Sequence, residues 1–416
     1  MRIAIIGGGI GGLTAALALR QFGFAPNVFE QAPELLEVGA AIIMWPNAMR
    51  ILDRLGLGGA VRQHGGVVEQ TLWLKRNGQL LNQVRMPTTD APAVALHRAD
   101  LQQILLHDLP QDSIHLGHVF ESWEELPDGM VAHLRDRTAF ECDVLIGADG
   151  LHSRARAQLL NDGPPIDRGY LTWRGVMPCT PKSLTPATAI EIHGHGQRFG
   201  IGPVGYGRVG WWATANKTAS HTRRQEIKAE ELSSNAQQLI PTQDGAAMRA
   251  ELLRLFDGWC EPVLELIQET PLTSLVRNIV FDRLAVRKWG AGSMTLIGDA
   301  IHPTTPNLGQ GGCLAIEDAA VLARCLKKYA LDSGGAVGRQ SGAASQVSIA
   351  LRRFESLRFE RTAAIARYSR VYGAVGQWEN RWSVQMRSLI LSWIPKGLTE
   401  RMLRGLFNYN AYAVSV

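Results

Sequence analysis

The chain has 416 residues, of which 46% are hydrophobic and 19% charged, so it can bury a large core and is not intrinsically disordered. Its formal net charge of +5 is spread without a basic block, which argues against nucleic-acid binding. Five widely spaced cysteines without a C-x-x-C argue against a disulfide scaffold or a metal site. No apolar stretch reaches the roughly 18 residues of a membrane span, and the first residues are strand-like rather than a signal peptide. We therefore expect a cytoplasmic protein.

The first thirty residues read as strand, glycine-rich turn, helix and strand. Residues 3–6 form a short apolar run that is typical of buried parallel strands. Residues 13–22 are rich in alanine and leucine, which favour a helix, and residues 27–30 have the composition of a second strand. The segment therefore predicts one compact βαβ unit.

Strand-rich and helical segments alternate along the rest of the chain. In chain order the sequence predicts a helix at 46–55, a buried strand at 142–146, strands across 170–215, helix across 226–268, strands across 273–297, a helix from about 312, a loop at 332–348, a long helix at 349–370 and an apolar, basic tail from 385. The runs ending at Ile146 and Ile297 resemble the first strand in composition, so we expect them to join it in one parallel sheet. Residues 160–290 would then be an insertion.

Gly7, Gly9 and Gly12 form a GxGxxG pattern directly after a strand and at the start of a helix. In this context the first glycine permits a tight turn, the second lets backbone approach a pyrophosphate, and the third lets helix and strand pack closely. Glu30, at the end of the second strand, can accept hydrogen bonds from a ribose diol. These residues predict a dinucleotide site that prefers FAD or NAD to NADP. A second GxGxxG match at 200–205 precedes no helix and predicts a β-hairpin instead.

Two further glycine motifs each follow a buried strand. The first contains Asp149 and reads as a strand-to-helix turn that Ser153 can cap. The second contains Asp299, whose carboxylate can accept a hydrogen bond from a hydroxyl group of a ribityl chain. Residues 306–312 then lead into a helix, and glycines there let a planar ring approach backbone N–H groups. The positive end of that helix can stabilise negative charge on such a ring.

Together these motifs resemble the single-component FAD-dependent monooxygenases, a group that includes the salicylate and 4-hydroxybenzoate hydroxylases. Three motifs match in the family's order: GxGxxG with Glu30, Asp149-Gly150 with Ser153 and Arg156, and Gly298-Asp299 with its continuation from Pro306. The segment His97-Arg98-Ala99-Asp100-Leu101 is similar to a fourth family element, whose arginine contacts the FAD. The resemblance covers essentially the whole chain.

The resemblance implies an α/β fold: a Rossmann-type FAD-binding fold with an inserted β-sheet substrate domain and C-terminal helices. The implied regions are an FAD-binding domain at 1–165 and 285–330, a substrate-binding sheet domain at 166–284 and a helical region at 331–416. The cofactor-binding residues that it implies are Gly7, Gly9, Gly12, Glu30, Arg98, Val119, Asp149, Gly298, Asp299, Pro306, Gly309, Gln310, Gly311 and Gly312.

The activity that the resemblance implies is insertion of one oxygen atom from O₂ into an electron-rich aromatic or heteroaromatic small molecule. Non-covalent FAD would be reduced by NADPH or NADH, which binds transiently, and a flavin C4a-hydroperoxide would transfer the oxygen. The transient reductant accounts for the single nucleotide fold. The alternative is epoxidation of an isoprenoid or other lipophilic substrate; a flavin halogenase and a flavin oxidase are lesser alternatives.

Within the family, two segments are similar to bacterial FAD-dependent urate hydroxylases: Gly39 to Asn47 and Thr304 to Cys313. Residues 307–318 are also similar to plant zeaxanthin epoxidases. Gly210 stands where the urate enzymes carry a pocket tyrosine, and Arg174 stands where they carry an asparagine. At these two positions the chain differs from the urate hydroxylases, which argues against urate as its substrate.

We predict a substrate pocket between residues 306–312 and the strands of the inserted region. Arg198, which matches an arginine that faces urate in the urate enzymes, and Arg174 are the candidate substrate-binding residues; the alternative is that both are solvated. His302 is either a proton-transfer group or a buried structural histidine. Trp211 and Trp212 point to opposite faces if they share a strand, so one should enter the core and the other can line the pocket.

The tail from Ser388 to Phe407 interleaves apolar residues with Lys396, Arg401 and Arg404. This pattern predicts a helix that packs on the domain or, alternatively, contacts a membrane peripherally. A small aromatic or lipophilic molecule is the expected partner, and the chain is expected to be a monomer or a homodimer.

Overall fold

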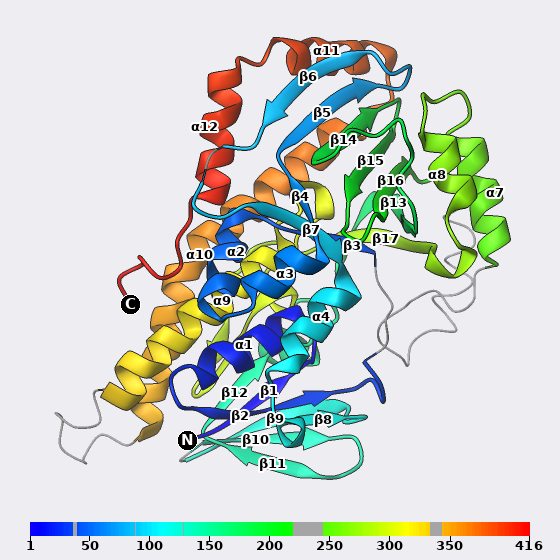
Figure 1. The fold of residues 1–416 in the computed structure, drawn as a ribbon. Helices are drawn as coiled ribbons and strands as arrows, with labels where there is room; N and C mark the ends of the chain where they lie inside the picture. Colours follow the sequence, from blue (N-terminus) through cyan, green and yellow to red (C-terminus); the bar gives the residue numbers. More distant parts are fainter. Residues whose placement is uncertain (36–39, 88, 128, 219–243, 333–342) are drawn as a thin grey trace.

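The computed structural model describes the chain except residues 36–39, 88, 128, 219–243 and 333–342 (Figure 1). A parallel sheet flanked by helices holds the N-terminus, and a larger, mainly antiparallel sheet lies at the other end of the molecule. The long helix α10 (Ala343–Gly376) runs from one part to the other. None of the described helices is both long and apolar enough to cross a bilayer.

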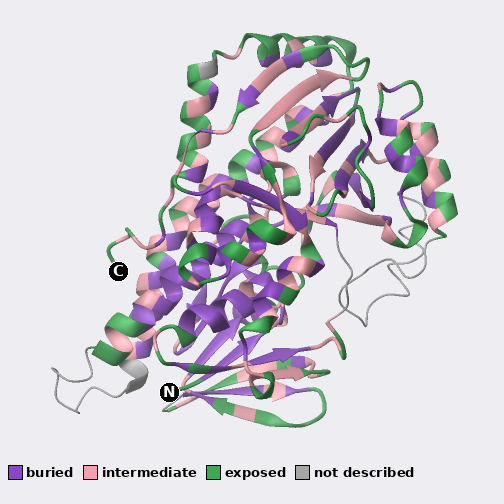
Figure 2. Cartoon of the chain, viewed as in Figure 1, coloured by how far each residue is buried: buried purple, intermediate pink, exposed green. Residues whose placement is uncertain are grey.

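The first part is built on a six-stranded sheet with the order β18-β19-β12-β1-β2-β8. Its strands are β1 (Arg2–Ile6), β2 (Ala25–Glu30), β8 (Ile114–Leu116), β12 (Val144–Gly147), β18 (Gly290–Ala291) and β19 (Met294–Leu296). All pairs are parallel except β18–β19. Leu145 lies opposite Met294, which confirms that two strands about 150 residues apart along the chain are neighbours. Both faces are covered, so residues 3–6 of β1 and all of β12 are buried (Figure 2).

Helices and two small sheets complete this part. The helices are α1 (Ile10–Arg20), α2 (Pro46–Arg54), α3 (Gly58–His64), α4 (Arg98–His107), α5 (Arg154–Leu160) and α9 (Gly311–Leu326), with short helical turns η1 (Gln111–Ser113), η3 (Gly298–Ala300), η4 (Pro306–Leu308) and η5 (Lys327–Leu331). One small sheet consists of β3 (Ala41–Met44), β7 (Ala93–His97) and β4 (Gly66–Val68). The other consists of β9 (Phe120–Leu126), β10 (Gly129–Leu134) and β11 (Ala139–Cys142). The predicted βαβ unit and the helix opened by Pro46 are confirmed.

The second part is a seven-stranded sheet with the order β17-β13-β16-β15-β14-β5-β6. Its strands are β17 (Val276–Asp282), β13 (Ile166–Met177), β16 (Val209–Asn216), β15 (Gln197–Pro203), β14 (Thr188–His193), β5 (Gln70–Lys75) and β6 (Leu80–Arg85). One face packs on α7 (Gly245–Leu255) and α8 (Val263–Glu269), with η2 (Leu272–Ser274) beside them. The antiparallel pairing of β15 with β16 confirms the hairpin expected at the second GxGxxG match.

Some predicted boundaries differ from the structure. Strands β5 and β6 come from residues 70–85, so the second sheet also recruits chain from before the expected insertion. Residues 343–348, expected in a loop, belong to α10, because Val347 packs in the core. Of the helix predicted across 226–268, residues 226–243 lie outside the described part, and the remainder divides into α7 and α8.

The C-terminal tail forms two helices rather than one. They are α11 (Arg381–Trp393) and α12 (Lys396–Phe407). Pro395 separates them, because proline has no N–H to donate to a continuing helix and holds the preceding Ile394 in an extended conformation.

Candidate flavin and substrate site

The GxGxxG loop joins β1 to α1 at the carboxyl end of the parallel sheet. Gly7 has φ +112°, and a Cβ there would lie 2.4 Å from the carbonyl oxygen of Ala148. A Cβ on Gly12 would lie 1.9 Å from the carbonyl oxygen of Gly7. A Cβ on Gly9 would meet no atom within 4 Å. The loop is therefore closely packed at Gly7 and Gly12, and it is open at Gly9, at the N-terminus of α1.

Glu30 ends β2 beside this loop and is buried. Its Oε2 accepts a hydrogen bond from the Gly8 N–H at 2.7 Å, and its Oε1 accepts one from the Ala32 N–H at 2.9 Å. The backbone N–H of His118 donates to the Glu30 carbonyl at 2.9 Å, so the next residue, Val119, lies at the same edge of the sheet. Both residues are thus near the glycine loop.

Asp149 follows β12 and lies beside the glycine loop, since a Cβ on Gly7 would be 3.1 Å from the Asp149 nitrogen. Its Oδ2 accepts hydrogen bonds from the N–H groups of Arg154 (2.8 Å) and Ala155 (3.2 Å) at the start of α5. Its Oδ1 is buried and has no partner among the described residues. Burial raises the pKa of this carboxyl, although hydrogen bonds from Ser153 and the backbone oppose the rise. The predicted cap is confirmed, because Ser153 Oγ accepts from the Arg156 N–H at 2.9 Å.

The third motif brings a second helix N-terminus to the same edge. Gly298 has φ +59°, and a Cβ there would lie 3.1 Å from Cβ of Ala315 in α9. A Cβ on Gly11 of α1 would lie 3.2 Å from the same atom. Helices α1 and α9 therefore begin side by side, and their unpaired N–H groups face one region. Such an edge favours an anionic ligand.

Arg98 lies close enough to Asp299 to influence its carboxyl group. Burial raises the pKa of Asp299, whereas the positive charges of His302 and Arg98 act in the opposite direction. Arg98 is the first residue of α4, and its side chain is exposed. Gln102 of α4 donates to the Gly8 carbonyl at 3.1 Å, which holds α4 against the glycine loop.

His302 lies behind the third motif in a buried charged cluster. Its Nε2 is 2.5 Å from Oδ2 of Asp318, which also accepts a hydrogen bond from the Gly298 N–H at 2.9 Å. Arg358 of α10 is fully buried and pairs with Oδ1 of Asp318 and with Glu317, each at 2.7 Å. Burial alone would raise the pKa of Asp318, but His302 and Arg358 outweigh it and hold this pKa below its usual range. The cluster fixes the turn that carries Asp299.

The face of the seven-stranded sheet away from α7 and α8 carries the remaining candidate residues. Trp211 is buried in the core with Trp173, whereas Trp212 lies on the opposite face, as expected for adjacent strand residues. Arg174 is paired in register with Trp212 and is half-buried. No hydrogen bond or ion pair joins the Arg174 side chain to the described residues. Burial lowers the pKa of Arg174, and the charge of Arg98 lowers it further, so the two guanidinium groups share one environment.

Arg198 shares that face but is fully buried among protein partners. Its Nε donates to Gln377 at 3.1 Å, its Nη1 to Glu191 at 3.2 Å, and its Nη2 to Asn307 in η4. Its guanidinium also lies 5.3 Å from the ring centroid of Trp212. Arg198 therefore ties the sheet to the segment that begins at Pro306.

Strand β3 separates the sheet from the glycine-rich segment before α9. A Cβ on Gly210 would lie 2.4 Å from Ala41, whereas a Cβ on Gly309 would lie 2.8 Å from Ile43. Trp45, just after β3, donates from its indole nitrogen to the Leu308 carbonyl at 3.1 Å. The two predicted walls of the pocket, residues 306–312 and the strands of the sheet, thus lie on opposite sides of β3. Arg198 links them.

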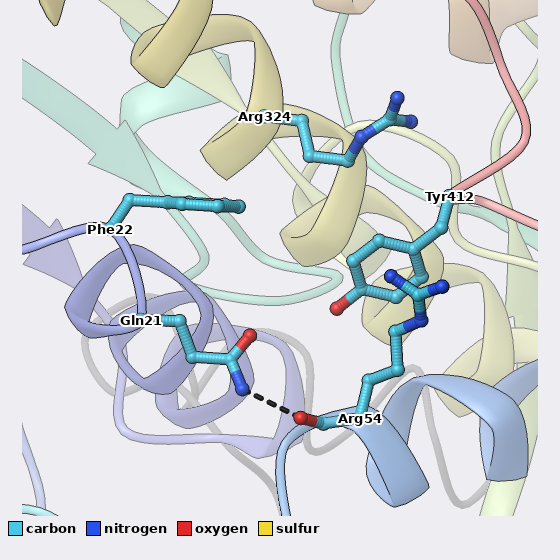
Figure 3. A pocket seen from close by; sticks show the side chains of 5 residues that line it. All are labelled: Gln21, Phe22, Arg54, Arg324 and Tyr412. Carbon is cyan, nitrogen blue, oxygen red and sulfur yellow. Dashed lines mark hydrogen bonds between the residues drawn. The ribbon is translucent and has the colours of Figure 1, made fainter.

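A separate cavity of about 610 Å³ lies at the far ends of α1 and α9 (Figure 3). It is lined by Gln21, Phe22, Arg54, Arg324 and Tyr412. A helix rises about 1.5 Å per residue, so α1 and α9 place this cavity roughly 16–24 Å from the glycine motifs at their other ends. It is not part of the candidate site.

The residues present fit FAD. Space is open over Gly9 and Gly150, the N-termini of α1 and α9 point to one edge, and Asp149 keeps a buried, unpaired oxygen there. A parallel sheet with a GxGxxG loop and an acidic residue on the second strand defines a dinucleotide-binding protein. Among the described residues, no cluster of histidine, cysteine, aspartate or glutamate side chains could hold a metal ion.

Comparisons with known proteins agree with this assignment. The FAD binding domain family matches residues 1–252 and 275–336. Aurachin C monooxygenase/isomerase of Stigmatella aurantiaca is 36% identical over 395 residues, which are 94% of each chain. FAD-dependent urate hydroxylase of Klebsiella pneumoniae is 30% identical over 97% of this chain and 99% of its own length. The structure of Klebsiella pneumoniae HpxO with FAD and uric acid has a TM-score of 0.82 at 28% identity, covering 98% of this chain and 96% of that one.

The chain belongs to the FAD binding domain family and is an FAD-dependent monooxygenase. The family resemblance and the fold expected from the sequence are therefore confirmed. A salicylate hydroxylase substrate complex, 21% identical with a TM-score of 0.75 over 99% of this chain and 96% of that one, shares the fold.

Sequence reasoning missed the residues that hold the motifs in place. Asp318, Arg358, Glu191 and Gln377 were not selected, although each bonds to a motif residue or to Arg198. One signal was present: two adjacent carboxylates, Glu317 and Asp318, occur within an otherwise apolar helix. Buried carboxylates need partners, so that pair indicated a buried cluster.

Proposed function

We propose that this monooxygenase adds one oxygen atom from O₂ to an electron-rich aromatic or heteroaromatic small molecule that carries or develops negative charge. NADPH or NADH serves as the transient reductant. Bound FAD supplies the oxygen-transfer chemistry, and the protein supplies binding, orientation and exclusion of water.

The proposed FAD site follows the edge where α1 and α9 begin. Gly7 and Gly12 shape the loop, and the pyrophosphate lies over Gly9 at the N-terminus of α1. Glu30 receives the adenosine ribose, since a carboxylate oxygen can accept more than one hydrogen bond. Val119 and Asp149 border the adenosine side, while Arg98 and Asp299 border the phosphates and the ribityl chain. The flavin ring would lie against the segment formed by Pro306, Gly309, Gln310, Gly311 and Gly312.

The observation that carries the substrate proposal is the side chain of Arg174. It is half-buried on the sheet face that looks toward the glycine-rich segment, and no carboxylate among the described residues pairs with it. A desolvated, unpaired guanidinium is costly to bury and favours an anionic partner. A phenolate, enolate or carboxylate of the substrate would meet this requirement, with Trp212 as an apolar wall.

Arg198 and His302 are proposed as positioning residues. Arg198 donates to three protein acceptors, which supports a role in holding η4 against the sheet rather than in binding substrate directly. His302 faces Asp318 and the Gly298 turn, which supports the structural alternative over proton transfer. Their effects on the reaction would therefore pass through Asn307 and Gly298.

We expect Arg174→Ala to weaken substrate binding about ten- to a hundredfold, because a hydrogen bond to a charged group contributes roughly 1.5–3 kcal/mol. The measurement is substrate-stimulated NAD(P)H oxidation across a panel of phenols and hydroxylated heteroaromatics, with mass detection of a product that gains one oxygen. FAD content should stay at the wild-type level.

Two variants serve as controls for this experiment. Arg174→Lys keeps the charge and should retain part of the affinity, whereas Arg287→Ala removes an exposed arginine and should change nothing. If Arg174→Ala keeps the wild-type substrate affinity and the wild-type coupling of NAD(P)H oxidation to product formation, Arg174 does not bind the substrate. Oxidation of NAD(P)H without any oxygenated product from the panel would contradict the proposed substrate class.

The exposed apolar side chains of α11 favour a second candidate, epoxidation of a lipophilic substrate. A product that gains one oxygen and opens to a diol in acid, without a new phenolic hydroxyl, would identify it. We propose a monomer or a homodimer that contacts a membrane peripherally through its C-terminal helices.

A further inference from the structure

Helix α11 has two apolar faces, and only one of them packs on the protein. Val384, Arg387 and Leu391 are buried against the body of the molecule. On the other side, Trp382 and Trp393 are each 78% exposed. The exposed apolar residues of α11 and α12, which we call the outer face, are Trp382, Met386, Leu389, Ile390, Trp393, Leu398 and Met402.

On α11 the outer face forms a stripe along one side of the helix. Trp382, Met386, Leu389 and Trp393 are spaced by four, three and four residues, which places them on one side of a helix with 3.6 residues per turn. Single exposed apolar residues are ordinary on protein surfaces, but a contiguous set marks an interaction site. The helix lies along the outer edge of the molecule, beside β5 and β6 (Figures 1 and 2).

The position of this stripe is fixed by the buried side of the helix. Arg387 donates from Nη1 to the Gly376 carbonyl at 2.7 Å and from Nη2 to the Gly194 carbonyl at 2.5 Å. Asn82 of β6 donates to the Leu391 carbonyl at 2.8 Å. Rotation of α11 to hide its tryptophans would break these bonds and expose Val384 and Leu391 instead. The apolar stripe therefore stays exposed unless a partner covers it.

The charges around the outer face identify the kind of partner. Arg381, Arg401 and Arg404 are exposed beside it. Glu400 is the only acidic residue in 381–407, and it lies 3.8 Å from Arg404. Glu379, just before α11, accepts a hydrogen bond from Asn216 at 2.9 Å. A second copy of this chain, docked about a two-fold axis, would bring this net-positive surface against itself. An anionic lipid surface instead offers headgroup phosphates to the arginines and an apolar layer to the stripe.

We infer that the outer face docks the protein on the surface of an anionic bilayer. Tryptophan is suited to this place, because its ring lies at the boundary between headgroups and acyl chains. The apolar stripe enters the boundary layer, and the arginines meet the phosphates. The seven-stranded sheet that carries Arg174 then faces the membrane side of the molecule. This docking rests on the peripheral membrane contact proposed above and specifies it, but it does not depend on the substrate, because it concerns binding to lipid alone.

The test is sedimentation of the FAD-loaded protein with phosphatidylcholine vesicles that contain roughly one-third phosphatidylglycerol, and with pure phosphatidylcholine vesicles. Wild-type protein should sediment with the anionic vesicles, and added salt should weaken that binding. Trp382→Ser combined with Trp393→Ser should lower the partition coefficient at least about tenfold, since two large apolar side chains no longer leave water. Arg401→Gln and Arg404→Gln should each lower it about fivefold on anionic vesicles only.

Leu284→Ser is the matched control, since Leu284 is comparably exposed but lies outside α11 and α12. It should partition as wild type does. FAD content and NAD(P)H oxidation without lipid should be equal in all variants, which shows that they fold. Equal partitioning of wild type and the double tryptophan variant would overturn the inference, as would failure of the wild type to bind anionic vesicles. So would a wild-type dimer that ignores vesicles and becomes monomeric in the double variant.

Discussion

Gly9→Val is expected to abolish FAD uptake while the chain remains folded. A Cβ on Gly9 would meet no protein atom within 4 Å, so the side chain extends into open space. It would occupy the space in front of the N-terminus of α1, where the pyrophosphate must approach the backbone. The measurement is the flavin-to-protein absorbance ratio after reconstitution with excess FAD, alongside far-ultraviolet circular dichroism.

Gly12→Val should also lose FAD, but for a different reason. A Cβ there would lie 1.9 Å from the Gly7 carbonyl, so the side chain would push α1 away from β1 and destabilise the fold as well. Gly59→Val is the control, because its Cβ also meets no atom within 4 Å and it lies in α3, away from the loop. Normal flavin content in folded Gly9→Val protein would refute the placement of the pyrophosphate.

Arg358→Met is expected to lower the free energy of unfolding by about 3–5 kcal/mol at neutral pH, because it removes the arginine partner of the buried Asp318 carboxylate. Arg358, Glu317 and Asp318 are all fully buried, and Arg361 still pairs with Glu317 in the variant. The measurement is urea unfolding of the protein with and without FAD. Arg287→Met, which breaks an exposed pair with Glu360, should cost less than about 1 kcal/mol.

The loss in Arg358→Met should depend on pH in a defined direction. In the wild type the pKa of Asp318 is held below its usual range, so this carboxylate adds stability above the ordinary carboxyl pKa and loses it as the pH falls. Without Arg358 the pKa of Asp318 rises, and the carboxyl takes up a proton in mild acid. The difference between variant and wild type should therefore be smaller at about pH 5 than at neutral pH. A pH-independent difference would show that lost packing, not the charge, causes the effect.

The sequence predicted the local elements and the motif residues well, for physical reasons that act over a few residues. An apolar run followed by Gly7, Gly9 and Gly12 specifies a strand, a turn and a helix, because each glycine answers a local steric demand. Pro46 opens α2 because proline lacks the N–H that the first helical turn leaves unpaired. Even the pairing of β12 with β19 could be predicted, since both are short apolar runs followed by a glycine motif.

Partners in space were beyond the reach of the sequence. Strands β5 and β6 join the second sheet, and an alternating strand pattern does not say which edge it will meet. Arg174 and Arg198 looked equivalent as strand arginines. Folding separates them, because Arg198 meets Glu191, Asn307 and Gln377, whereas the Arg174 side chain meets no hydrogen-bonding partner among the described residues.

The sequence by itself determined the dinucleotide site, because glycines and carboxylates at short, fixed spacings specify phosphate-binding geometry. Its resemblance to the FAD-dependent monooxygenases implied the flavin and the oxygen chemistry. Only the tertiary structure decided which charges are satisfied inside the protein and which remain for a ligand or a membrane. That division depends on burial and on contacts between segments far apart in the chain. A charged side chain that is paired within the protein is not available to a ligand, whereas an unpaired one favours a ligand of opposite charge.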